Sequence, residues 1–402
     1  MRAVKPPRVI PMDIPEPQSP ETPIIEVAPP PVAEVRGLRM LIPPRASTQE
    51  IDNLCHRAAN AGINMLIARV YRRGTTMWPS DEASRWRLPR VRWWLGERDV
   101  MGELARTCQS HGLVLCAWVE LLPAVDLSRE SWSPMARRHW EWRMRRFTGS
   151  PYPVGEESGQ VFLCPSRREV RLFLGDVCCE LADRYPIEAL WIEGLRFPLG
   201  AERPDSSLCF CPSCRARVRA EIDVDLTEMP LDTRSEAYQA WTQWRSDLLS
   251  GFLGELIARV RRVRAGLPIM AGVPAGWKPA LLERMGLMDW VHWGSEGLID
   301  LISPMWFGAP GALSTEEWVT MIREDFSALG PTGHAAPVLP LSDLHSEETP
   351  LLAAARALPL SGHVWDAQPG LPTDAEWEAM ARVHGDLNAL VPEVDPLDAA
   401  RA

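Results

Sequence analysis

The sequence predicts an α/β protein built on a (β/α)8 barrel, the TIM barrel fold. From Arg36 onward, short runs of β-branched and aliphatic residues alternate with amphipathic stretches of helical length, a pattern typical of parallel strands covered by helices. The long polar segments follow the predicted strands, as the loops on the catalytic face of such a barrel do. A doubly wound open sheet is the alternative, but the chain has no glycine-rich phosphate-binding loop to support it.

Two tails are predicted to flank a single domain. Residues 1–35 contain ten prolines and little apolar periodicity, which predicts a disordered, extended N-terminal tail. We expect the barrel to span residues 36–392, because 402 residues with 46% hydrophobic composition suffice for one large core. Residues 393–402 are predicted to form a disordered C-terminal tail.

Each barrel element has a local signal in the chain. Ser47 is predicted to cap a helix that ends at Ala61 before Gly62, with Glu50 completing a capping box. The eight predicted strands are short apolar runs, namely 37–42, 64–70, 113–119, 189–192, 268–273, 301–305, 337–339 and 362–365. The remaining helices are predicted from apolar residues at helical spacing, over 100–110, 167–184, 241–263, 315–328, 346–357 and 374–390.

The composition limits the partners and the location of the protein. A formal net charge of −10 gives no general attraction for nucleic acid. No stretch approaches the ~20 apolar residues that span a bilayer, and the N-terminus lacks the apolar core of a secretory signal. The chain has nine cysteines, an odd number, and those outside the run Cys209, Cys211 and Cys214 lie mostly in apolar surroundings. This pattern fits a reducing cytoplasm better than a disulfide scaffold. We therefore expect a cytoplasmic protein, and nothing in the sequence indicates its oligomeric state.

The tryptophan content points to carbohydrate as a ligand. The chain has 18 Trp against 4 Tyr and 8 Phe. An exposed indole offers a flat apolar face beside a polar N–H, which suits a sugar ring. Packing of long loops onto the barrel is the alternative interpretation. The loop tryptophans concerned are Trp78, Trp86, Trp93, Trp94, Trp132, Trp140 and Trp142.

Carboxylates at predicted strand ends are the candidate catalytic groups. Glu193 follows the apolar run of the fourth strand, and we expect the apolar neighbours Leu195 and Phe197 to raise its pKa toward that of a general acid. Asp366 and Glu120 end two other strands and are the candidate partners. Two further acids are expected to have structural roles: Asp343 suits a helix cap better than catalysis, and Asp300 opens a strand at the opposite end of the barrel.

Five further residues near strand ends are candidate substrate-binding groups. Arg69 and Arg196 suit sugar hydroxyls or a carboxylate, or alternatively pair with Glu120 and Glu193. Three tryptophans are expected to line the mouth of the barrel, with core packing an equal alternative for the first: Trp118, Trp306 and Trp365.

Several of these segments resemble a known family, the family-10-like glycosyl hydrolase domain. The similar segments are Ala68-Arg69, His111-Gly112 with the strand that follows, Tyr185 to Pro198, Asp289-Trp290 and Ile299 to Met305. The resemblance implies a (β/α)8 barrel that cleaves or binds polysaccharides. The family's fourth-strand motif carries further acids, where this chain has Glu188-Ala189 and Glu193-Gly194.

The run Cys209, Cys211 and Cys214 has metal-ligand spacing. It resembles the zinc loop of family 42 β-galactosidases, and that resemblance implies Cys164 as the upstream fourth ligand and a structural Zn²⁺. Free thiols in a loop and a redox or iron–sulfur site are the alternatives. No organic cofactor is predicted.

These observations lead to two hypotheses of function. The first is a glycoside hydrolase-like protein that acts on O-glycosidic bonds of a polysaccharide with Glu193 as general acid. The alternative is a non-catalytic carbohydrate-binding or scaffolding barrel with a structural zinc loop.

Overall fold

The structure is a computed structural model. It describes residues 34–385, except 44, 92–94, 127–132, 154–156, 158, 200–205, 282–284, 307–313, 331–332, 346–348 and 369. Both predicted tails lie outside the described residues, apart from the last two residues of the N-terminal one. Three of the loop tryptophans, Trp93, Trp94 and Trp132, also lie outside them.

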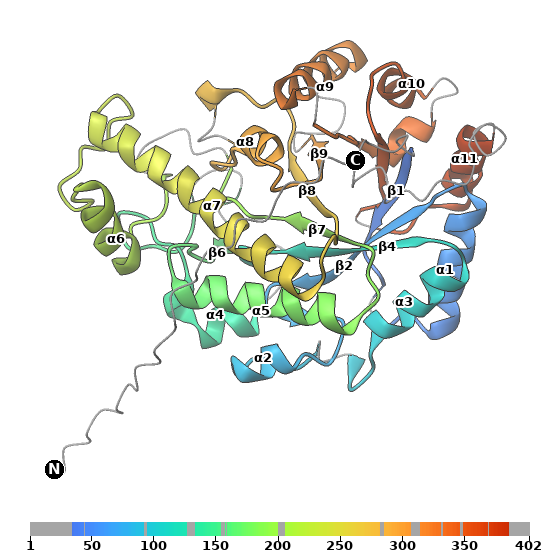
Figure 1. Ribbon diagram of the computed structural model, residues 1–402, viewed down its shortest axis with the longest axis horizontal. Helices are drawn as coiled ribbons and strands as arrows, with labels where there is room; N and C mark the ends of the chain where they lie inside the picture. Colours follow the sequence, from blue (N-terminus) through green and yellow to red (C-terminus); the bar gives the residue numbers. More distant parts are fainter. Residues whose placement is uncertain are drawn as a thin grey trace.

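Eight parallel strands form a barrel at the centre of the molecule (Figure 1). In spatial order they are β10 (Val338–Pro340), β11 (Gly362–Asp366), β1 (Val35–Met40), β2 (Met65–Arg72), β4 (Val114–Glu120), β7 (Ala189–Glu193), β8 (Ile269–Pro274) and β9 (Leu301–Met305). The ends of this path meet where Ile302 forms a parallel bridge with Ala335. The predicted (β/α)8 fold is thereby confirmed.

Helices surround the barrel and connect successive strands (Figure 1). They are α1 (Thr48–Asn60), α3 (Val100–Ser110), α5 (Arg168–Arg184), α7 (Glu236–Val263), α8 (Trp290–Ser295), α9 (Thr315–Leu329), α10 (Pro350–Arg356) and α11 (Asp374–Gly385). The predicted capping box of Ser47 and Glu50 begins α1. The short helix α8 was not predicted, because six residues give too little periodicity.

Further elements, most of them short, lie in the long connections between the barrel strands and helices. The sequence did not predict them. They are β3 (Thr75–Thr76), α2 (Asp81–Arg85), β5 (Pro123–Asp126), α4 (Pro134–Arg138), η2 (Trp140–Trp142), β6 (Gln160–Phe162), α6 (Pro212–Ile222), η4 (Pro279–Leu281) and η5 (Leu341–His345). β5 and β6 pair as an antiparallel ribbon beside the barrel. Most of these elements are too short for periodicity to separate them from loops. The longer α6 buries only Cys214 and Val218, so its sequence shows no apolar stripe.

The barrel interior is filled by side chains of alternating strand residues. Among them are Val35, Ile67, Cys116, Trp118, Ala189, Trp191, Met270, Leu301, Val338 and Val364, all buried. The intervening residues face the helices and belong to a larger outer core. Because the interior is packed, polar chemistry is restricted to the ends of the strands.

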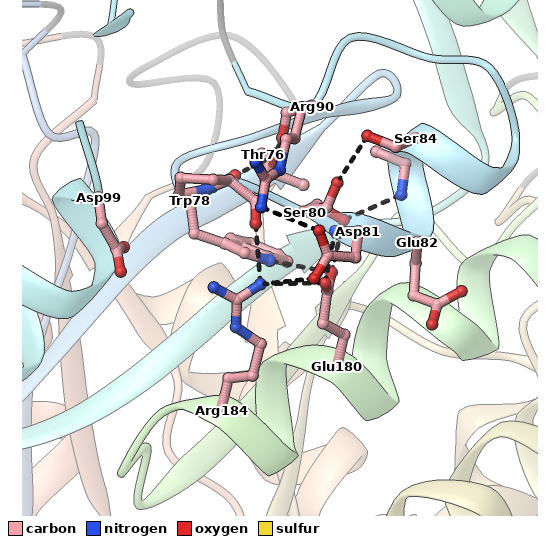
Figure 2. A network of polar contacts seen from close by, with 12 residues as sticks. Thr76, Trp78, Ser80, Asp81, Glu82, Ser84, Arg90, Asp99, Glu180 and Arg184 are labelled. Carbon is pink, nitrogen blue, oxygen red and sulfur yellow. Dashed lines mark hydrogen bonds and ion pairs between the residues drawn. The ribbon is translucent and has the colours of Figure 1, made fainter. Parts of the chain in front are cut away.

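One buried carboxylate on α5 anchors the loop that follows β2. Glu180 of α5 accepts hydrogen bonds from Trp78 Nε1 (3.0 Å), the Ser80 hydroxyl and the Asp81 main-chain N–H (2.7 Å). Figure 2 shows Arg184 approaching the same carboxylate, at 3.2 Å. Trp78 is fully buried in this network. Its indole therefore packs and bonds within the protein, as the packing alternative predicted.

Among the helices in the described ranges, none is both long enough and apolar enough to cross a membrane.

Candidate active site and four-cysteine centre

Four charged side chains share the inward parity of the barrel strands. Arg39 follows Val35 and Gly37 at two-residue steps, and Glu193 follows Ala189 and Trp191 in the same way. Asp366 and Glu120 occupy the equivalent places at the ends of β11 and β4. Because alternate residues of a strand face the same side, these four side chains face the interior of the barrel. They stand at the carboxyl ends of their strands and therefore lie at its mouth.

Arg39 joins the two main candidate acids. Its Nη2 donates to both oxygens of Glu193, at 2.9 and 2.7 Å, and its Nη1 donates to Asp366 Oδ1 at 2.8 Å. The Arg39 side chain is 6% exposed, against 14% for Glu193 and 30% for Asp366. Burial disfavours the charge of Arg39, but the two carboxylates outweigh it and raise its pKa above the ordinary value. One guanidinium therefore spans both acids.

Glu193 has a further partner on its own strand. Trp191 Nε1 donates to Glu193 Oε2 at 3.2 Å. Leu195 and Phe197, the apolar neighbours expected from the sequence, are both buried and belong to the outer core. The carboxylate itself, however, binds the guanidinium of Arg39, a partner that the sequence did not indicate.

Glu120 belongs to a separate ion pair. It accepts a hydrogen bond from Arg72 Nε at 2.9 Å. Burial alone would raise the pKa of Glu120, but Arg72, Arg69 and Arg73 together lower it. Glu120 is therefore held as the anion and is poorly suited to donate a proton.

The three predicted mouth tryptophans occupy different environments. Trp118 is fully buried, with the Arg39 guanidinium 3.9 Å and that of Arg69 5.0 Å from its ring. Trp365 does not lie at the mouth, because it faces the outer core, where its Nε1 approaches His384 at 3.5 Å. Trp306, just beyond β9, is 42% exposed.

Arg196 holds a loop instead of an acid at the mouth. Its guanidinium binds Glu157 through two hydrogen bonds of 2.9 and 2.7 Å, and the same carboxylate accepts from the Leu199 main-chain N–H at 2.6 Å. The pair is almost fully buried. The alternative pairing of Arg196 with Glu193 is therefore not formed.

The two acids expected to have structural roles bind main-chain groups. Asp343 accepts from the main-chain N–H groups of Leu351 and Leu352 at the start of α10. Asp300 binds the Ile269 N–H at 2.7 Å and Arg261. Both carboxylates stabilise the ends of secondary-structure elements, as the sequence analysis expected.

The four predicted cysteines come together in one buried cluster. The ligand atoms of Cys164, Cys209, Cys211 and Cys214 all lie within 4.8 Å of one another. Cys164 Sγ is 3.4 Å from Cys214 Sγ and 3.6 Å from Cys211 Sγ. A tetrahedral ion with Zn–S bonds of about 2.3 Å would separate its sulfurs by about 3.8 Å. The cluster therefore fits a thiolate-bound metal ion.

The four thiols influence one another's protonation, and main-chain N–H groups approach one of them. Hydrogen bonds from Cys164, Cys209 and Cys214 lower the pKa of the Cys211 thiol. Burial raises the pKa of Cys164. Main-chain N–H groups of Arg145 and Cys211 point at Cys209 Sγ, at 3.3 and 3.4 Å. Such N–H groups stabilise a thiolate ligand.

Comparison with known proteins agrees with this architecture. A family model described as Glycosyl hydrolase-like 10 matches residues 32–320. The chain belongs to this family. No curated protein matches it.

Solved structures similar to this member of the Glycosyl hydrolase-like 10 family include two carbohydrate-active enzymes. One is alpha-L-fucosidase isoenzyme 2 from Paenibacillus thiaminolyticus, with 12% identity and a TM-score of 0.57, covering 89% of this chain and 49% of that chain. The other is the catalytic domain of the beta-amylase from Paenibacillus polymyxa, with 12% identity and a TM-score of 0.57, covering 88% and 98%. The chain thus spans about half of the fucosidase structure, and at this identity the likeness concerns the fold.

Proposed function

We propose that this protein hydrolyses an O-glycosidic bond of a polysaccharide, with Glu193 and Asp366 as its two carboxylates. The observation that carries the proposal is the Arg39 bridge, which brings both acids together at the mouth of the barrel. Barrels of this kind keep their active sites at this face. The family and the two neighbours, a fucosidase and an amylase by name, support a carbohydrate substrate.

The contacts of the two acids support different roles. Glycoside hydrolysis uses one proton donor and one nucleophile or base. Glu193 receives two bonds from Arg39 and one from Trp191, whereas Asp366 receives one short bond from Arg39. Asp366 is also the more exposed of the two. We therefore assign the anionic role to Glu193 and the proton donor to Asp366, which separates from Arg39 when glycan binds. This reverses the acid role that the sequence suggested for Glu193.

Trp306 and Arg69 are the proposed substrate contacts. Trp306 is exposed beside the end of β9, so its indole face can stack on a sugar ring. Arg69 follows the inward parity of β2. Trp118 and Arg196 are proposed to shape the mouth, because the first is fully buried and the second is bound to Glu157.

The four cysteines are proposed to bind one structural Zn²⁺. Four thiolates leave no open position for water or substrate, so such an ion has no direct catalytic role. Metal analysis of the purified protein tests this assignment, with one zinc per chain as the expected result. Iron in place of zinc would favour the iron–sulfur alternative.

The test of the proposed function is a polysaccharide panel with product detection by mass spectrometry. Wild type is expected to release oligosaccharides from at least one glycan, and Glu193→Gln is expected to release none. Glu255→Gln is a matched control, since this surface residue of α7 pairs with Arg171 on the outside of the barrel. Equal product from wild type and Glu193→Gln would contradict the proposal.

The same Arg39 bridge also favours a second function, a non-catalytic carbohydrate-binding barrel. A guanidinium bound to both acids occupies oxygens that would otherwise be available to a substrate, which a binding protein tolerates and an enzyme must overcome. Binding of a glycan that neither wild type nor any variant cleaves would favour this second function.

A further inference from the structure

A continuous series of main-chain hydrogen bonds joins the four-cysteine cluster to the end of β7. Leu163, next to Cys164, donates its N–H to the Leu122 carbonyl oxygen at 2.8 Å. Leu122 donates to the Gly194 carbonyl oxygen at 3.1 Å, and Leu121 donates to that of Glu193 at 2.9 Å. Two such steps therefore lead from the main chain beside Cys164 to Gly194, the residue after the proposed catalytic carboxylate Glu193.

A second series leads from Cys209 back to Cys164. The Arg145 N–H points at Cys209 Sγ at 3.3 Å, and the Phe210 N–H donates to the Arg145 carbonyl oxygen at 2.7 Å. The Cys164 N–H donates to the Trp142 carbonyl oxygen at 2.7 Å. The segment 142–145 thus lies between the two parts of the chain that supply the cysteines.

Gly194, in the first series, has a left-handed backbone and little space for a side chain. Its φ of +70° is a left-handed conformation that disfavours other residues. A Cβ at this position would lie 2.7 Å from Pro123 Cδ, in the ribbon that leads to Cys164. The turn at Gly194 therefore packs closely against Pro123, which directly follows the hydrogen-bonded residues Leu121 and Leu122.

We propose that a Zn²⁺ ion held by the four cysteines positions Glu193 through Leu163, Leu122 and Gly194. The ion cross-links Cys164 to the run Cys209, Cys211 and Cys214, and so holds the loop after β7 against the ribbon of β5 and β6. In its absence, the hydrogen bonds alone keep these segments together, and the end of β7 opens more often. The inference rests on the proposed function only in naming Glu193 as the group whose position matters.

The first experiment removes the ion from the full-length wild-type protein with a chelator and follows amide hydrogen exchange. Exchange at Leu121, Leu122 and Leu163 is expected to accelerate at least tenfold. The amides of Val35 and Val364 lie on the opposite side of the barrel, where they donate to the carbonyl oxygens of Ser361 and Pro337. Their exchange rates are expected to stay unchanged. Added Zn²⁺ should restore protection. Equal acceleration on both sides of the barrel, or none, would overturn the proposal.

The second experiment uses the reciprocity of coupled sites. If the ion stabilises the turn at Gly194, then Gly194→Ala must weaken ion binding although it removes no ligand. Competition with a chromophoric chelator is expected to show Zn²⁺ affinity reduced about tenfold or more. Cys178→Ser is the matched control, since this buried thiol of α5 lies outside the cluster, and its affinity should equal that of wild type. An unchanged affinity in Gly194→Ala would overturn the coupling.

Neither measurement uses turnover. A protein that fails to cleave any glycan but shows both effects would retain the positioning role and lose only the proposed function. If Gly194→Ala does not fold, the chelation experiment on wild type decides the proposal by itself.

Discussion

Arg39 Nη2 donates to both carboxylate oxygens of Glu193, at 2.9 and 2.7 Å, from the first strand of the barrel to the fourth. The same guanidinium holds Asp366 of the eighth strand. Arg39 is therefore the residue that assembles the candidate site from three strands.

Removing Arg39 should destabilise the protein strongly. Arg39→Met leaves Glu193 and Asp366 without the cation that both of them bind, and breaking a largely buried pair in this way costs about 3 kcal/mol. Urea unfolding at pH 7 measures the loss. Arg57→Met is the control, because its pair with Asp374 is exposed and is worth less than about 1 kcal/mol. Equal losses in the two variants would contradict the bridge.

Trp306 and Trp118 should separate ligand binding from stability. Trp306→Ala removes a partly exposed ring and is expected to weaken glycan binding by about 1 kcal/mol, with a loss of stability well below that of Trp118→Ala. Trp118→Ala creates a cavity in the barrel interior and should lower the free energy of unfolding by about 3 to 5 kcal/mol. Calorimetric titration and urea unfolding provide the two readouts. A large stability loss in Trp306→Ala would argue against the proposed platform.

Glu180 should be more important for stability than surface acids. Glu180→Gln weakens a carboxylate that accepts from Trp78, Ser80 and Asp81 (Figure 2). Loss of charge in this network is expected to cost about 2 kcal/mol, with a change in the fluorescence of the buried Trp78. The exposed Glu255→Gln should cost less than about 1 kcal/mol, so a similar small cost at Glu180 would refute the network's role.

A buried histidine pair should make the protein sensitive to acid. His384 Nδ1 lies 2.8 Å from the Ala61 carbonyl oxygen, so Nδ1 carries the proton and Nε2 accepts from His363 at 3.1 Å. Burial, with the nearby charges of Arg36 and Arg356, lowers the pKa of His384 to about 4, although the bond to Ala61 opposes this shift. Burial also lowers the pKa of His363.

The sign of the effect follows from proton binding. Between about pH 6.5 and pH 4 the unfolded chain binds a proton at position 384 that the folded chain does not, so stability falls as pH falls, by about 3 kcal/mol at pH 4. His384→Gln should be less stable than wild type at pH 7, and the difference should shrink toward pH 4. A difference that is constant with pH would show that His384 is not held neutral by burial.

Local signals in the sequence were sufficient for most of the barrel. The capping box of Ser47 and Glu50, the helix Val100–Ser110 and the strand Leu301–Met305 were all predicted as observed. Each depends on residues within a few positions of one another. The short excursions, such as α2 and β5, have no comparable signal and were missed.

The partners within the site could not be predicted in the same way. Glu193 and Asp366 were found because they end apolar strands, but their cation lies 154 and 327 residues away along the chain. A charged residue at an inward position of the apolar strand Val35–Met40 was the available signal. Tertiary contact decides which acid such an arginine binds, and the sequence suggested Arg69 or Arg196 instead.

The most direct test of the proposed site compares Glu193→Gln, Asp366→Asn and Glu120→Gln on a cleaved glycan and on an aryl glycoside with a good leaving group. We predict that Glu193→Gln lowers kcat/KM by at least about a thousandfold on both substrates. Asp366→Asn should lower it by about a hundredfold or more on the glycan and far less on the aryl glycoside, whose leaving group needs no proton. Glu120→Gln should stay within about tenfold of wild type. An unchanged kcat/KM in folded Glu193→Gln would contradict the assignment of Glu193 as the essential carboxylate.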